Sequence, residues 1–223
     1  MLKLGGALIA GVVAMGGWAV VTVKDLPEYF VAGQQYTIEF KVRQHGHTLL
    51  GSLEPQLIVS TSAPRLGGLF GGANEQRIPA AAKGSEGTYA ATFTAPRAEQ
   101  LFLTIKSGFG ASDLRLYPAA VINPGMTRPA MAQADRGRML FVAKGCNACH
   151  SNSDLADRPD NQQIKVGPEL GGRQLARDYV IQKIKNPNSQ VMPDLGLTDA
   201  EAAAIAVFVN GGGAAATGGR GSR

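Results

Sequence analysis

Two cysteines and a histidine lie together in the segment Cys146-Asn147-Ala148-Cys149-His150, and the chain has 2 cysteines in all. The pattern Cys-x-x-Cys-His is the attachment signature of c-type haem. Two thiols three positions apart on a tight helical turn can each add to one of the two vinyl groups of a porphyrin, and the adjoining histidine is then held over the iron as its proximal ligand. The motif therefore predicts one covalently bound haem c.

Other uses of the two cysteines fit the sequence less well. A thioredoxin-like dithiol opens a helix that follows a strand, whereas an amphipathic helical pattern precedes this motif. A four-ligand zinc site needs a second ligand pair, and the other histidines, His45 and His47, lie about a hundred residues upstream. A disulfide framework needs more cysteines than this chain has. Haem attachment is the interpretation that accounts for both.

The elements that must position the motif follow from the sequence on either side of it. A helical pattern begins at Asp135 and leads into the motif. Two irregular segments, residues 166–172 and 191–195, lie downstream. Thr198 and Glu201 then form a Thr-x-x-Glu capping box, which is the signature of a helix N-terminus. The last helix predicted there has an apolar face made of Ala204, Ile205, Phe208 and Val209.

In order and spacing, these pieces resemble the mono-haem class I cytochromes c over residues 135–211. The resemblance implies an all-α domain in which His150 is the proximal iron ligand and Met192, in its Met-Pro-x-Leu setting, is the distal ligand. It also implies that Pro168 backs the haem, with its carbonyl near the His150 ring. The metal ligands are therefore expected to be His150 and Met192, and the cofactor-binding set to comprise these two with Cys146, Cys149, Gly167, Pro168 and Leu170.

The resemblance also implies how the helices pack. Gly137, Phe141 and Phe208 are expected where the first and last helices cross. The polar segment 151–165 departs from the family pattern and is predicted to be a surface insertion that leaves the ligands undisturbed. A middle helix is expected to cover the haem edge with Tyr179, Ile181 and Ile184.

Met192 is one of 6 methionines in the chain, and the usual role of a methionine is to fill a core. Met139 lies on the helix before the motif, where a core role is expected. Met192 instead lies in an irregular segment between two helices, where a chain crossing the far face of the haem is needed. On this position and on the resemblance, we expect Met192 to bind iron and Met139 to pack.

Residues 20–122 are predicted to form a separate all-β domain. Apolar and polar residues alternate along residues 36–42, with the period of a half-buried strand. Many short strands separated by turn residues favour an immunoglobulin-like sandwich. Residues 31–42 and 86–96 resemble small exported modules of the FixH/YtkA-like group, a fold that implies no function by itself. Strands are predicted at residues 20–23, 36–42, 56–60, 87–94, 101–107 and 111–117.

Two features of the β-domain have both a functional and a scaffold interpretation. His45 and His47, separated by Gly46, could hold copper or zinc, since imidazole suits both metals, or could lie solvated in a turn between strands. The Gly-rich segment 65–73 lacks the Gly-Lys-Ser/Thr of a phosphate loop. Its apolar residues could dock a partner or fold back onto the core.

The remaining segments are a leader, a linker and a tail. Residues 1–19 contain an apolar run that ends in a small-x-small triplet, which predicts a signal peptide or, alternatively, a retained membrane anchor. Both place the protein in the periplasm or on the extracytoplasmic face of the cytoplasmic membrane. Proline-rich, aperiodic residues 118–134 predict a semi-rigid linker over 123–134. Residues 212–223 are low in complexity and predict a disordered tail.

Charge and ligand set together narrow the function. The net charge of +5, from 22 basic and 17 acidic residues, forms no basic stripe and excludes a nucleic-acid binder. Iron with two strong protein ligands has no open position, which suits electron transfer rather than oxygen chemistry. We expect a one-electron carrier, not an enzyme, that serves redox partner proteins in a respiratory or photosynthetic chain. The alternatives are a haem subunit docked permanently in a larger membrane or periplasmic oxidoreductase, and a ligand sensor in which Met192 is displaced.

Overall fold

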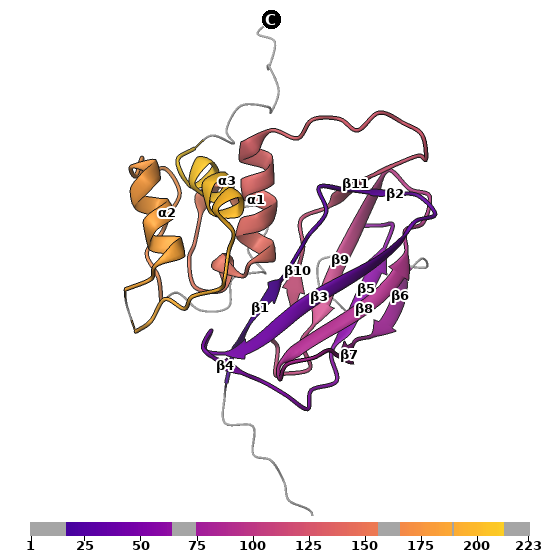
Figure 1. Cartoon of the computed structure of the whole chain (residues 1–223), viewed down its shortest axis with the longest axis horizontal. Helices are drawn as coiled ribbons and strands as arrows, with labels where there is room; N and C mark the ends of the chain where they lie inside the picture. Colours follow the sequence, from indigo (N-terminus) through magenta and orange to yellow (C-terminus); the bar gives the residue numbers. More distant parts are fainter. Residues whose placement is uncertain (1–16, 64–74, 156–165, 189, 212–223) are drawn as a thin grey trace, which may run out of the picture.

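The computed structural model describes residues 17–63, 75–155, 166–188 and 190–211 of the 223. Predictions for most of the leader, the Gly-rich segment, residues 156–165 of the polar insertion and the tail lie outside these residues. The described part consists of an N-terminal region of two β-sheets and a C-terminal region of α-helices (Figure 1). The predicted fold class, all-β followed by all-α, is therefore confirmed.

The β-region is a sandwich of two sheets. One sheet has the order β1-β3-β8-β7, with β4 paired to β3, and the other has the order β2-β11-β9-β5-β6, with β10 paired to β9. The described strand pairs are antiparallel except for β2 with β11, which is parallel. This order fits an immunoglobulin-like module. The strands are β1 (Ala19–Val23), β2 (Tyr29–Val31), β3 (Gln35–Gln44), β4 (Thr48–Leu49), β5 (Gln56–Ser60), β6 (Glu75–Pro79), β7 (Ala81–Ala82), β8 (Thr88–Thr94), β9 (Gln100–Lys106), β10 (Leu114–Arg115) and β11 (Ala119–Ile122).

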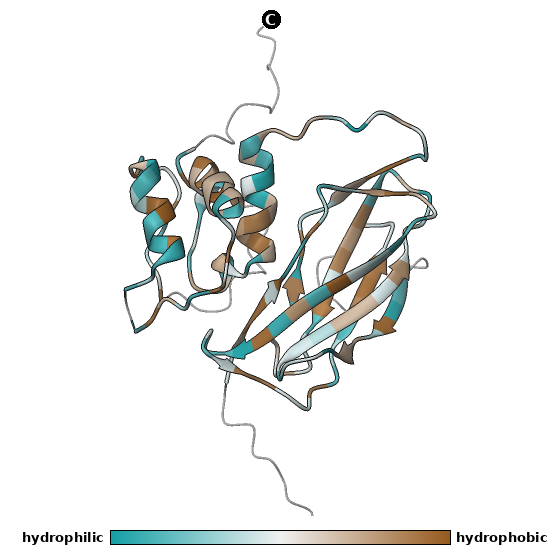
Figure 2. Cartoon of the chain, in the orientation of Figure 1, coloured by the Kyte–Doolittle hydropathy of each residue, from teal (hydrophilic) through white to brown (hydrophobic). Residues whose placement is uncertain are grey.

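The core of the sandwich follows from the alternation in its strands. Ile38, Phe40 and Val42 of β3 are buried, and their neighbours along the strand are partly exposed. They meet β8, where the rings of Phe40 and Tyr89 lie 6.0 Å apart. The hydropathy colouring shows the same alternation along β3 (Figure 2). Burial of such side chains stabilises each by about 1.5–3 kcal/mol.

The strand predictions missed β2, β4, β6 and β7, and they differ from the structure at two further places. The strand expected at 111–117 is reduced to β10, two residues long, because Ser112 and Asp113 are used in the turn that follows β9. β11 lies within residues 118–134, whose prolines gave no strand signal. It forms because pairing with β9 and β2 completes the second sheet.

The C-terminal region contains α1 (Gln133–Ala143), α2 (Arg177–Lys185) and α3 (Asp199–Val209). The Thr198–Glu201 capping box is present, with Thr198 Oγ1 accepting from the Glu201 amide at 3.2 Å. Gly137 allows α1 and α3 to touch, because a Cβ there would overlap the Ala204 carbonyl. The rings of Phe141 and Phe208 meet beside this crossing at 5.5 Å.

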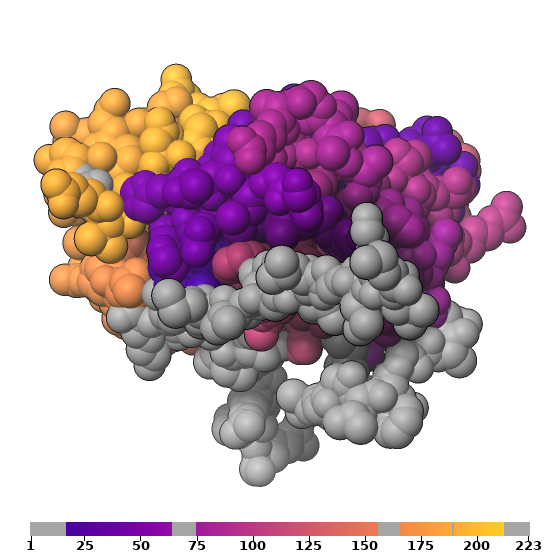
Figure 3. All heavy atoms as spheres, turned by 90° about the horizontal axis from the view of Figure 1, so that it is seen from below, coloured from indigo at the N-terminus to yellow at the C-terminus, as the bar shows by residue number. Residues whose placement is uncertain are grey.

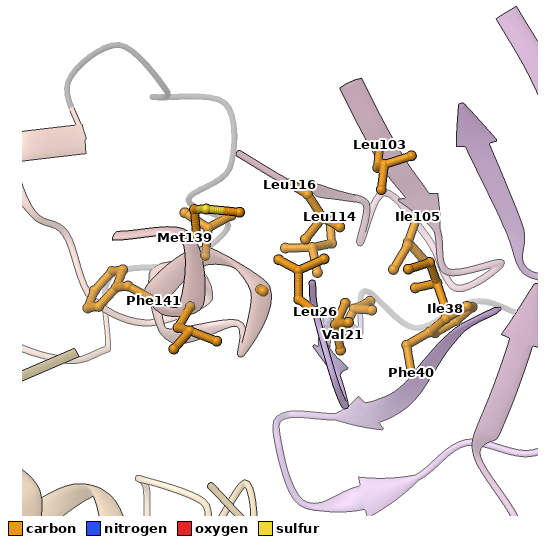
Figure 4. Close-up of a cluster of buried hydrophobic side chains, with 14 of the residues drawn as sticks. Val21, Leu26, Ile38, Phe40, Leu103, Ile105, Leu114, Leu116, Met139 and Phe141 are labelled. Atoms are coloured by element: carbon orange, nitrogen blue, oxygen red, sulfur yellow. The ribbon is translucent and has the colours of Figure 1, made fainter. Parts of the chain in front are cut away.

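The two regions pack directly on each other. Met139 of α1 lies in one continuous apolar cluster with Leu114 and Leu116 of the β-region (Figure 4). Lys144, after α1, donates to the Lys24 carbonyl and pairs with Glu201 of α3 at 2.6 Å. Figure 3 shows the orange and yellow helical region against the indigo strands. The two regions are therefore joined by direct side-chain contacts as well as by the linker.

In the described ranges, no helix is both long enough and apolar enough to cross a bilayer.

Candidate haem site

The helical region surrounds a cavity of about 360 Å³. This is within the usual size range of sites for small molecules and cofactors, about 300–1,000 Å³. Its walls come from α1, α2, α3, the two irregular segments and, across the domain boundary, Val20 of β1. The seven residues predicted to bind the cofactor all line it: Cys146, Cys149, His150, Gly167, Pro168, Leu170 and Met192.

The cysteine motif is held in a tight turn after α1. The chain reverses through Gly145, whose φ of +78° lies in the left-handed region that favours glycine. Residues Cys146–Ala148 then form a 3₁₀ turn, and the His150 amide donates to the Cys146 carbonyl at 2.9 Å. The two thiols are not joined in a disulfide.

The electrostatics of the thiols argue against dithiol redox chemistry. Burial raises the pKa of the Cys146 thiol to about 12, with a further contribution from Cys149. Burial also raises the pKa of Cys149. Reactive Cys-x-x-Cys pairs have a lowered pKa and open a helix after a strand. Here burial shifts the pKa of both thiols in the opposite direction and the motif follows a helix, so the thioredoxin-like interpretation is not supported.

The His150 ring is fixed by the segment that follows the polar insertion. Its Nδ1 lies 2.9 Å from the Pro168 carbonyl oxygen, which can only accept, so Nδ1 carries the proton and Nε2 has a free lone pair. A Cβ at Gly167 would overlap the ring, so glycine is required there. The Gly167 amide donates to the Cys149 carbonyl, and the Leu170 amide to the Ser151 carbonyl, each at 2.9 Å. These bonds tie residues 167–170 to the motif.

Met192 and Met139 lie in different surroundings. Met192 lies in the loop between α2 and α3 and lines the cavity that His150 also lines. Met139 is 4% exposed, and it lies in the core between α1 and the β-region (Figure 4). Cys146, Cys149, His150 and Met192 thus offer two thiols, one imidazole nitrogen and one thioether to a single apolar space. This donor set fits a covalently bound haem.

One comparison with known proteins places a match on the region that contains this cavity. A protein-family model described as "Cytochrome C oxidase, cbb3-type, subunit III" matches residues 132–209. These residues form a cytochrome c domain. A solved structure, the superoxide reductase (neelaredoxin) from Ignicoccus hospitalis, is similar at 14% identity and a TM-score of 0.31, over 48% of this chain and 83% of that chain. No curated protein matches the chain.

A cytochrome c domain implies covalently bound haem c and a role in electron transfer. The helix that was expected to cover the haem edge is α2, and Tyr179 and Ile184 line the cavity as expected. Ile181 does not line it, and Val180 does. Positions 180 and 184 share a face at helical spacing, whereas 181 lies about 100° away from 180 around the axis. Ile181 packs partly buried against the core instead.

Sequence reasoning missed the part of the site that comes from the β-region. Val20 of β1 lines the cavity of the cytochrome c domain, and a Cβ at Gly145 would lie 2.6 Å from Val20 Cγ1. The prediction ended the leader at residue 19, and β1 begins at Ala19. No signal in the sequence connects Val20 to residues more than a hundred positions away.

His45, Gly46 and His47 form the turn between β3 and β4. Among the residues that the structure describes, no three His, Cys, Asp or Glu side chains are grouped as metal ligands. His47 Nε2 lies 3.3 Å from the Val191 carbonyl oxygen. The metal interpretation of this turn therefore has no support, and the turn lies against the cytochrome c domain.

Proposed function

We propose that this protein is an exported c-type cytochrome that carries single electrons through one covalently bound haem c. The observation that carries the proposal is that Cys146, Cys149, His150 and Met192 line one cavity of a cytochrome c domain. When bound, the haem supplies a one-electron iron couple. The chain's own residues determine how that couple is held and what can reach it.

Each residue has a distinct task in this proposal. Cys146 and Cys149 hold the cofactor through thioether bonds, which prevent its loss outside the cytoplasm. His150 would offer Nε2 to the iron, because its Nδ1–H donates a hydrogen bond to the Pro168 carbonyl oxygen. Met192 would offer its thioether sulfur to the same iron, and iron held by two protein ligands would be poorly suited to oxygen chemistry. A thioether ligand also favours the reduced iron and raises the potential.

A second candidate is a haem c subunit that stays docked in a membrane-bound oxidase complex. The specific support is that the matching family model is described as subunit III of a cbb3-type oxidase. In this case the β-region is the docking module. Native size in detergent extracts of source membranes separates the candidates, because a free carrier runs as a small species and a subunit comigrates with the complex. Either protein would work on the extracytoplasmic side of the cytoplasmic membrane, with redox proteins as partners.

The variant Met192→Ala tests the ligand assignment, with Met139→Leu as its matched control. Wild-type oxidised protein is expected to show the weak long-wavelength Met-to-iron charge-transfer band. Met192→Ala should abolish the band, lower the potential and open the iron to carbon monoxide, because the ligand that favours reduced iron is gone. Met139→Leu conserves the volume of a packing residue and should leave these properties nearly intact. A wild type that binds carbon monoxide readily would contradict the carrier and favour a sensor.

A further inference from the structure

The turn between β3 and β4 contacts both chain neighbours of Met192. His47 Nε2 lies 3.3 Å from the Val191 carbonyl oxygen, and because a carbonyl can only accept, the imidazole is the donor. On the other side, a Cβ at Gly46 would lie 2.8 Å from Pro193 Cγ. Val191 and Pro193 flank Met192 directly. Two adjacent residues of the β-region therefore lie against the backbone segment that carries the proposed distal ligand.

Arg43, at the end of β3, interacts electrostatically with Asp194, the residue that follows Pro193 in the Met192 loop. Arg43 is half-buried; burial lowers its pKa, and the negative charge of Asp194 opposes that shift. Asp194 also accepts from the Gly196 amide at 2.8 Å, which closes the loop on itself. The loop thus meets a donor, a close steric contact and a positive charge, all presented by residues 43–47.

The turn is well suited to act as a fixed support. Arg43 pairs with Leu49 across the hairpin, and the His47 amide donates to the Gln44 carbonyl at 3.0 Å. β3 is a long strand held on both sides, by β1 and β8. The described part of the loop after α2, by contrast, has no helix or strand of its own before α3 begins. A rigid element therefore lies against an irregular one.

We propose that the β3–β4 turn, through Gly46 and His47, positions the Met192 loop, so that the β-region controls how firmly the distal ligand is held. This rests on the proposed function, because it assumes that Met192 binds the iron. His47 and Gly46 are positioning residues that act through Val191 and Pro193. The β-region is then a working part of the redox site and not a passive appendage.

A matched pair of glycine variants in the full-length holoprotein provides the test. Gly46 and Gly33 have nearly equal φ values, +81° and +79°, but a Cβ at Gly33 meets nothing within 4 Å. Gly46→Ala and Gly33→Ala therefore impose the same backbone strain, and the first also presses on Pro193. We expect Gly46→Ala to weaken the Met-to-iron band and to speed carbon monoxide binding to the reduced protein about tenfold, equivalent to ~1.4 kcal/mol. Gly33→Ala should match wild type in both.

A histidine series tests the hydrogen bond separately. His47→Ala should speed carbon monoxide binding about fivefold, which corresponds to ~1 kcal/mol and is typical of one hydrogen bond. His47→Gln keeps a donor and should recover most of the loss. His45→Ala is the control on the same turn, because the His45 ring lies 5.3 Å from the Trp18 ring.

The outcomes are distinguishable. If Gly46→Ala and His47→Ala both show the same Met-to-iron band as the wild type, the positioning role is overturned and the carrier proposal stays intact. An equal change in Gly33→Ala also overturns it, because the effect would then be general destabilisation. A wild type without the band contradicts both proposals.

Discussion

The β-region and the cytochrome c domain bury their apolar side chains in different ways. In the β-region, fully buried residues such as Phe30, Phe40 and Tyr89 pack between two sheets and fill the space between them. In the cytochrome c domain, α1 and α3 meet closely at Gly137, but α2 faces a cavity of about 360 Å³. The difference teaches that one region completes its core with protein alone, whereas the other needs a cofactor to complete it.

Loss of haem should have the largest effect, and it should destabilise the cytochrome c domain far more than the β-region. In the double variant Cys146→Ala/Cys149→Ala the cofactor cannot attach, and the cavity is left without its filling. Unfilled apolar cavities cost about 24 cal/mol per Å³, so a space of this size is worth several kcal/mol. We expect far-ultraviolet circular dichroism to show the helical signal reduced and melting at low temperature, while the β signal persists.

Acid-acetone extraction provides the companion measurement, since wild-type haem should stay on the protein. If the helices of the double variant melt cooperatively at the wild-type temperature, the cytochrome c domain does not need the cofactor to complete its core, and the contrast between the two regions is wrong.

Breaking the ion pair at the domain boundary should have the next largest effect. Lys144 is 4% exposed and its partner Glu201 13%. Removing one partner of a buried pair typically costs about 3–5 kcal/mol, because the other charge stays buried. We therefore expect Lys144→Met to lower the free energy of unfolding of the holoprotein in urea by about 3 kcal/mol.

Lys185→Met is the matched control for that change. Lys185 also pairs with a carboxylate, Asp199 at 2.9 Å, and donates to a carbonyl, that of Leu197. Asp199 is 92% exposed, and exposed pairs contribute about 0–1 kcal/mol. If the two variants lose equal free energy of unfolding, burial does not make the Lys144–Glu201 pair more stabilising than the exposed Lys185–Asp199 pair.

The isolated β-region should show the smallest loss. Expressed alone, residues 20–122 keep both sheets but return to water side chains that pack against α1, such as Leu114 and Leu116 (Figure 4). These side chains still pack against the rest of the sandwich, so their partial exposure costs about 2 kcal/mol in total, less than full exposure would. We expect a soluble fragment that unfolds cooperatively at lower urea than the same region of the full chain. An unfolded or aggregated fragment would show that the two regions form one structural unit.

How far the sequence predicts this molecule depends on the range of each interaction. The haem motif, the Thr198 capping box and the alternation in β3 depend on residues a few positions apart, and all were predicted. The contribution of Val20 to the cavity and the contact of His47 with Val191 join residues far apart in the chain. They depend on how the domains pack, and no local pattern encodes that. On α2, Tyr179 and Ile184 line the cavity as expected, and Val180 takes the place expected of Ile181.

The central claim is that this protein carries one electron at an iron closed by His150 and Met192. The most direct test is an equilibrium redox titration of the wild-type holoprotein, carried out under argon and again under carbon monoxide. A ligand that binds only the reduced iron raises the midpoint potential in proportion to its affinity, by linkage. The account predicts a single one-electron curve whose midpoint is the same under both gases. A midpoint that rises clearly under carbon monoxide would show an accessible iron and contradict the account.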